Sequence, residues 1–160
     1  MFRDFVESAE LESLEVTVRP LSESKLALSP ERDVEDFLEA NLQVIEPGLK
    51  LYREDDLSGR QFGTDVSRID LLGIDAGGNF VVIELKAGEA DRTVLGQILP
   101  YMGWVREHLA KGKAVRGIVV ASDFSSDLLA AINVLSNFSL YRYAVQFSFK
   151  KVAPLAPVAR

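Results

Sequence analysis

The sequence FVVIELK at residues 80–86 predicts a β-strand in the middle of a sheet. Its apolar run is rich in β-branched residues, which is typical of a strand covered on both faces. Glu84 and Lys86 interrupt this run, and because side chains alternate along a strand they lie on the same face. Burying an unpaired carboxylate or ammonium is costly, so two charges in such a strand indicate a site.

Two explanations of Glu84 and Lys86 are open at this point. The first is a mutual ion pair at the end of the strand. The second is a metal site, because a hard cation such as Mg²⁺ binds one or two carboxylates and completes its shell with water and substrate phosphate. A second carboxylate, Asp70, lies within RIDLLGID at residues 68–75, which predicts a neighbouring strand. We favour the metal site.

The turn between these two strands decides whether Asp70 reaches Glu84. Residues 76–79, Ala-Gly-Gly-Asn, are typical of a hairpin. A loop with an even number of residues places Asp70 on the wrong face of the sheet. A three-residue loop that pairs Asp75 with Asn79, or a β-bulge, places Asp70 opposite Glu84. We therefore expect an odd loop or a bulge.

A family resemblance follows from the order and spacing of these residues. Asp70 precedes the hairpin, the triplet Glu84-Leu85-Lys86 follows it, and QILPY at residues 97–101 lies on an expected helix. With these motifs the chain resembles the PD-(D/E)XK nuclease superfamily. Residues 31–151 are most similar to the nuclease domain of the NucS (EndoMS) endonucleases, which is related to RecB-type nuclease domains.

The resemblance implies a metal-dependent nuclease. In that family the residues that correspond to Asp70 and Glu84 bind Mg²⁺ or Mn²⁺, together with the backbone carbonyl at the position of Leu85. The residue at the position of Lys86 orients the attacking water. Hydrolysis then leaves a 5′-phosphate and a 3′-hydroxyl.

The resemblance also implies functional residues on two helices. Gln97 and Tyr101 are four residues apart, hence on one helix face, and are expected to contact the lysine or the substrate phosphate. The family has a glutamate on the helix before the hairpin, for which Glu31 fits best and Glu35 is the second choice. Residues 55–67 look longer than the corresponding loop of the family, which leaves that assignment open.

The expected nuclease-like domain spans residues 31–155, after an extension of residues 1–30 and before a tail of residues 156–160. NucS enzymes carry a separate DNA-binding β-domain before the nuclease domain, and this chain has only about 30 residues there. Mismatch specificity is therefore not carried over. We expect a second copy of the chain, or another protein, to supply substrate specificity.

Composition indicates one globular domain, with 160 residues of which 48% are hydrophobic. The absence of cysteine excludes disulfides and thiolate metal sites, and with no apparent leader or membrane span it favours the cytoplasm. A net charge of −6 is unusual for a DNA-binding protein and predicts weak, salt-sensitive affinity. Cations such as Arg53, Arg60, Arg68, Lys86, Arg92 and Arg106 could line one basic face, and the alternative is that they are scattered over the surface.

Periodicity and capping residues predict the remaining elements. In chain order they are a helix at residues 1–11, a strand at 14–20, a helix that begins after Ser29 and ends before Pro47, an edge strand at 49–52, a turn at 55–60, a helix at 91–109, a strand at 115–121, a helix at 125–135 and closing strands at 141–152.

This order predicts an α/β or α+β fold with a restriction-endonuclease-like mixed central sheet flanked by helices. The favoured function is metal-dependent hydrolysis of DNA phosphodiester bonds, by an endonuclease rather than an exonuclease. Two alternatives stay open. One is a catalytically inactive nucleic-acid-binding or protein-interaction module on the same fold, and the other is an enzyme that acts on RNA.

Overall fold

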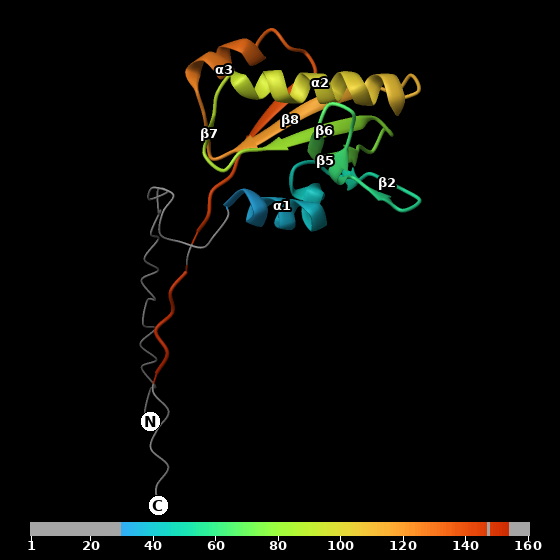
Figure 1. Ribbon diagram of the computed structural model, residues 1–160. Helices are drawn as coiled ribbons and strands as arrows, with labels where there is room; N and C mark the ends of the chain where they lie inside the picture. The colour runs from blue at the N-terminus through green and yellow to red at the C-terminus, as the bar shows by residue number, and fades with distance from the viewer. Residues whose placement is uncertain (1–29, 147, 154–160) are drawn as a thin grey trace, which may run out of the picture. The chain divides into compact units, whose positions relative to one another are not determined.

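The computed structural model describes residues 30–146 and 148–153 (Figure 1). Residues 30–143 belong to one compact unit. The other described residues belong to a second unit, and none of them is in a helix or strand. The elements expected within residues 1–20 and the expected cap Ser29 lie outside the described residues.

The predicted helices and strands of the described residues appear in the expected order, together with short strands that the sequence did not predict. They are α1 (Pro30–Asn41), a 3-10 turn (Leu42–Val44), β1 (Lys50–Leu51), β2 (Arg53–Glu54), β3 (Leu57–Ser58), β4 (Arg60–Gly63), β5 (Arg68–Ile74), β6 (Phe80–Leu85), β7 (Glu89–Ala90), α2 (Thr93–His108), β8 (Val115–Ala121), β9 (Asp123–Phe124), α3 (Ser126–Ile132) and β10 (Phe138–Arg142).

Local sequence explains where two of the helices begin. Pro30 opens α1, where its fixed φ suits the first turn and its missing N–H is not needed, and Glu31 and Asp33 follow near the positive end of the helix dipole. The side chain of Ser125 accepts a hydrogen bond from the N–H of Leu128 and so caps α3. Both starts agree with the sequence-based prediction.

The central sheet is mixed, with strand order β1-β5-β6-β8-β10. Strands β5 and β6 form an antiparallel hairpin, while β6, β8 and β10 run parallel, with α2 between β6 and β8 and α3 between β8 and β10. Two short strands share the outer edge of β5: β4 pairs with its first half and β1 with its end. The predicted mixed sheet flanked by helices is confirmed.

Helices cover both faces of this sheet (Figure 1). Helices α2 and α3 pack on one face and α1 on the other. Every residue of β6 is buried, as expected for a central strand. The core under α2 and α3 includes Phe62, Val82, Val94, Ile98, Tyr101, Met102 and Leu128, and the core under α1 includes Leu38, Leu42, Leu71, Val81, Ile83 and Leu85. None of the described helices has the length and apolar character that a membrane crossing requires.

The prediction of a turn at residues 55–60 is wrong for most of this stretch. This stretch forms the small β2–β3 hairpin and then enters β4, a strand that the sequence did not predict. The N–H of Gly59 donates to the carbonyl of Tyr52, and the N–H of Leu72 donates to the carbonyl of Gly59. These bonds dock the segment on β5, so its strand character comes from pairing and not from apolar periodicity.

The closing strands expected at residues 141–152 are also wrong in position. β10 begins at Phe138 and ends at Arg142, and no described residue after it is in a strand. Phe138 pairs with Gly117 of β8, and a methyl group on Gly117 would lie 2.7 Å from the Phe138 ring. The missing side chain at Gly117 therefore makes room for the ring and favours the earlier start.

The docking of Gly59 yields a stability prediction. A Cβ atom at Gly59 would lie 2.1 Å from the carbonyl oxygen of Leu72, a backbone atom that cannot move without breaking the sheet. We expect Gly59→Ala to lower the free energy of unfolding by about 2 kcal/mol or more, measured by urea denaturation. Gly63→Ala, at the last residue of β4, is the control, because a Cβ there has no atom within 4 Å. Equal midpoints for the two variants would contradict this.

Candidate active site

The β5–β6 hairpin closes with the odd loop that the sequence predicts. The N–H of Asp75 donates to the carbonyl of Asn79 at 2.9 Å, which leaves Ala76, Gly77 and Gly78 as the loop. One oxygen of the Asp75 carboxylate accepts the N–H groups of Gly77 and Asn79, both at 2.9 Å. Gly78 adopts φ +79°, a left-handed conformation that glycine tolerates.

This loop fixes which residues face each other across the strands. Leu71 pairs with Ile83 and Leu72 with Val82, and the same register sets Asp70 opposite Glu84. The prediction of an odd loop that brings the two acids together is confirmed.

Asp70 is held by the strand that carries Glu84. The N–H of Leu85 donates to Oδ2 of Asp70 at 2.8 Å. Burial raises the pKa of Asp70, this N–H opposes the rise, and the charges of Glu31 and Glu35 add to it. Asp70 therefore sits in a site where its negative charge lacks full compensation.

Glu84 and Lys86 form the ion pair that the sequence left open. The ammonium Nζ of Lys86 lies 3.0 Å from Oε1 of Glu84, whose side chain is only 8% exposed. Burial, together with the charge of Asp70, raises the pKa of Glu84 from 4.5 to about 7, although Lys86 opposes the rise. One lysine thus faces two carboxylates, so a simple ion pair explains only one of the acids.

The donor set fits a hard divalent cation. Asp70 and Glu84 supply carboxylate oxygens from neighbouring strands, which is the number of protein carboxylates typical of Mg²⁺. Among the described residues no group of three or more His, Cys, Asp or Glu is arranged to hold a metal ion, so a site here would rely on water and substrate for its other ligands. The single histidine, His108, stacks on Trp104.

Both candidate glutamates of α1 lie near this site, in different environments. Glu31 is exposed, and its charge raises the pKa values of both Asp70 and Glu84. Glu35 is 8% exposed and accepts hydrogen bonds from Arg60 at 2.9 Å and from Gln61 at 3.0 Å. Which of the two takes part in chemistry stays a prediction.

Arg60 and Gln61 are residues of this site that the sequence did not identify. The sequence suggests Arg60 only as a cation of a possible basic face. In the structure its guanidinium contacts Glu35, Asp36 and Glu39 of α1. Both residues lie in the segment expected to be a loop. Their place depends on the pairing of β4 with β5, and no sequence signal marks it.

Gln97 and Tyr101 lie on α2, the helix that packs on one face of the sheet. Tyr101 is 8% exposed and belongs to the core beneath α2, whereas Gln97, one turn earlier, is exposed. Neither side chain makes a hydrogen bond to Asp70, Glu84 or Lys86 in the described structure. Their role at the site stays a prediction.

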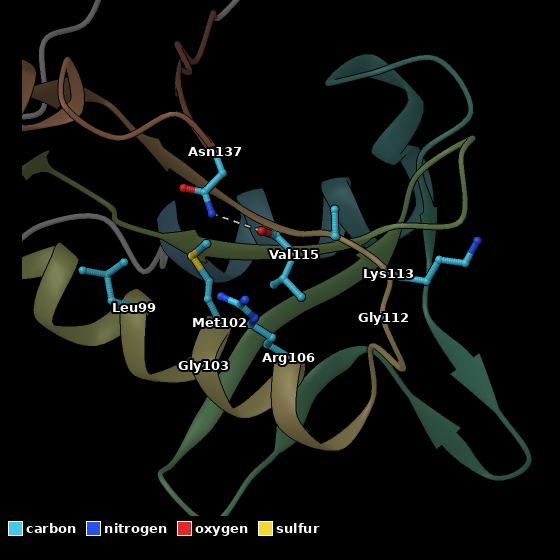
Figure 2. Close-up of a pocket in the computed structure, with 9 residues that line it drawn as sticks. Leu99, Met102, Gly103, Arg106, Gly112, Lys113, Val115 and Asn137 are labelled. Carbon is cyan, nitrogen blue, oxygen red and sulfur yellow. Dashed lines mark hydrogen bonds between the residues drawn. The ribbon is translucent and has the colours of Figure 1, made fainter.

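A hollow of about 650 Å³ lies elsewhere on the domain (Figure 2). Its lining includes Leu99, Met102, Arg106, Lys113 and Val115. Val115 pairs with Phe80, the first residue of β6, so the hollow lies about 13 Å along that strand from Glu84. It is therefore separate from the carboxylate site.

Comparisons with known proteins show which family the domain resembles. Residues 30–137 match the family described as Endonuclease NucS C-terminal domain. Endonuclease NucS of Thermococcus kodakarensis is 38% identical over 104 residues, which are 64% of this chain and 38% of the relative. Endonuclease NucS of Pyrococcus abyssi is 34% identical over 117 residues, which are 72% of this chain and 43% of the relative. The chain thus spans about two-fifths of the length of the curated relatives it matches.

Two solved structures resemble the fold. The crystal structure of a repair endonuclease from Pyrococcus abyssi has a TM-score of 0.61 at 25% identity and covers 76% of this chain and 50% of that chain. The structure of an EndoMS–dsDNA complex has a TM-score of 0.61 at 27% identity and covers 79% of this chain and 49% of that chain. The resemblance to the NucS nuclease domain is confirmed.

The raised pKa of Glu84 predicts how stability depends on pH. The folded chain holds this proton up to about pH 7, while the unfolded chain releases it near pH 4.5. The folded state therefore binds more protons in that window, and its stability falls as pH rises through it. We expect the free energy of unfolding of wild type to fall by about 2–4 kcal/mol more than that of Glu84→Gln between pH 4.5 and pH 8. Urea denaturation in the presence of a chelator measures both. Parallel profiles would contradict this.

Proposed function

Because the chain belongs to the Endonuclease NucS C-terminal domain family, we propose that it is a nuclease domain that hydrolyses DNA phosphodiester bonds with a divalent metal ion. The observation that carries this proposal is the buried carboxylate of Glu84 beside the partly buried carboxylate of Asp70, with Lys86 as the cation next to them. Support for DNA as substrate comes from relatives named endonucleases and from a similar structure described as a complex with double-stranded DNA.

In this proposal Asp70 and Glu84 hold Mg²⁺ or Mn²⁺, together with the backbone carbonyl of Leu85, in a site of PD-(D/E)XK type. When bound, such an ion lowers the pKa of a water molecule and stabilises the negative charge that develops on the phosphate. The N–H of Leu85 keeps Oδ2 of Asp70 in place.

Lys86 acts as the residue that orients the attacking water. Its side chain is 29% exposed, and its ammonium lies 3.0 Å from Glu84. An ammonium has three N–H donors, so it binds the carboxylate and a water molecule at once. The proposed attack is in line and leaves a 5′-phosphate and a 3′-hydroxyl.

The α2 residues have different parts in this proposal. Gln97 is exposed and is the member of the pair that meets a substrate phosphate. Tyr101 is nearly buried, so its main contribution is to pack α2 against the sheet and thereby place Gln97. Of the two helix acids, Glu31 makes no hydrogen bond or ion pair with a described residue, and we propose that it assists at the metal site.

Charge bears on how the domain holds DNA. The net charge is −6, and five of the acids that contribute to it lie on α1: Glu31, Asp33, Glu35, Asp36 and Glu39. Acids at that density repel phosphates. We propose that a second copy of the chain or another protein contributes to DNA affinity and determines the substrate preference. The proposed location is the cytoplasm.

The test is incubation of the full chain with labelled single-stranded, duplex, mismatched and branched DNA, and with RNA, in Mg²⁺ or Mn²⁺. We expect cutting that chelator abolishes, with Asp70→Ala and Lys86→Ala each reducing the rate at least 100-fold. Asp56→Ala and Lys113→Ala are matched controls, because Asp56 is exposed in the β2–β3 turn and Lys113 lines the separate hollow.

Three results would contradict the proposal. Cutting that persists in both site variants points to another site, and cutting of RNA alone points to an RNA-directed enzyme. Tight, metal-independent DNA binding without cutting, kept or strengthened in Asp70→Ala, points to an inactive binding module.

A further inference from the structure

Two consecutive residues of β4 reach the same carboxylate, which ordinary strand geometry does not allow. Side chains at neighbouring positions of a strand point to opposite faces. Yet Nε of Arg60 lies 2.9 Å and Nε2 of Gln61 lies 3.0 Å from Oε1 of Glu35. Gln61 has φ +46°, a left-handed conformation that is uncommon for a residue with a side chain. This local distortion turns both side chains toward α1.

The register of β4 also aligns Gln61 with the acids of the site. Arg60 pairs with Leu71 and Phe62 with Ile69, so Gln61 lies opposite Asp70 on β5. Asp70 in turn lies opposite Glu84 on β6. Gln61, Asp70 and Glu84 therefore form one row across three strands.

The amide of Gln61 connects the helix acid to the strand acid. Its Nε2 lies 3.0 Å from Oε1 of Glu35 and 3.4 Å from Oδ1 of Asp70, and an amide nitrogen carries two hydrogens to donate. The other oxygen of Asp70, Oδ2, accepts the N–H of Leu85 at 2.8 Å. Each oxygen of Asp70 thus has its own donor, one from each neighbouring strand.

We propose that Gln61 is a positioning residue that orients the carboxylate of Asp70 for metal binding, an inference that rests on the proposed function. A neutral amide suits this task because it joins two acids without adding charge to an acid-rich site. Arg60 completes the arrangement, since it holds Glu35 on α1 and so fixes the far end of the link. Removal of a hydrogen-bond donor that orients a metal ligand commonly weakens metal affinity 10- to 100-fold.

The test is calorimetric titration of the metal-free full chain with Mn²⁺, for wild type, Gln61→Ala, Gln61→Gly and Asp70→Ala. Both substitutions delete the amide, but glycine adopts a left-handed φ without the clash of a Cβ atom, so Gln61→Gly is expected to unfold at a higher temperature than Gln61→Ala. Gln61 is exposed, so neither change opens the core. Gln43→Ala, at an exposed glutamine of the 3-10 turn, is the control.

We expect both variants at position 61 to bind Mn²⁺ about tenfold more weakly than wild type and Gln43→Ala, despite their different thermal stability. Loss in Gln61→Ala with full affinity in Gln61→Gly would overturn the inference, because affinity would then follow backbone strain. Unchanged affinity in both, with loss in Asp70→Ala, would overturn it while leaving the metal site in place. Wild-type affinity in Asp70→Ala would overturn the metal site and this inference together.

Discussion

The turn at Asp75 sets the constraint on which the rest of the domain depends. Its carboxylate binds the N–H groups of Gly77 and Asn79, and this closes the β5–β6 hairpin with three residues. A shift of one residue would exchange the two faces of β5. Because Leu71 and Leu72 serve the two opposite cores, such a shift would disrupt packing as well as separate Asp70 from Glu84. Core packing and site geometry are therefore enforced by the same register.

Negative charge exceeds positive charge around Asp70 and Glu84. Lys86 is the cation beside two carboxylates, while Arg60 is occupied by three acids of α1. The fold tolerates the excess through N–H donors, such as that of Leu85 on Asp70, and through retained protons, as the raised pKa of Glu84 indicates. Packing against a further apolar group would not relieve the repulsion between the two carboxylates, because it would only add to the cost of burying their charge.

The sequence predicts this fold wherever burial dictates residue type. Strands β6 and β8 are mostly apolar because helices cover both faces, and the charge of Glu84 within β6 is conspicuous for the same reason. Strand β4 was missed because Arg60, Gln61 and Gly63 show no apolar alternation. Gln61 was missed because its place depends on a left-handed φ and on pairing with β5. Tyr101 shows the converse, since a family motif does not reveal that a side chain is mostly core.

The topology also orders the events of folding. Asp70 and Glu84 meet in a hairpin closed by a short turn, and hairpins form within microseconds, whereas the parallel pairing of β6 with β8 must wait for the chain of α2 to cross over. The two like charges are thus brought together before the rest of the sheet can shield them. In such an early hairpin both carboxylates face water, so salt that screens their repulsion would favour its closure.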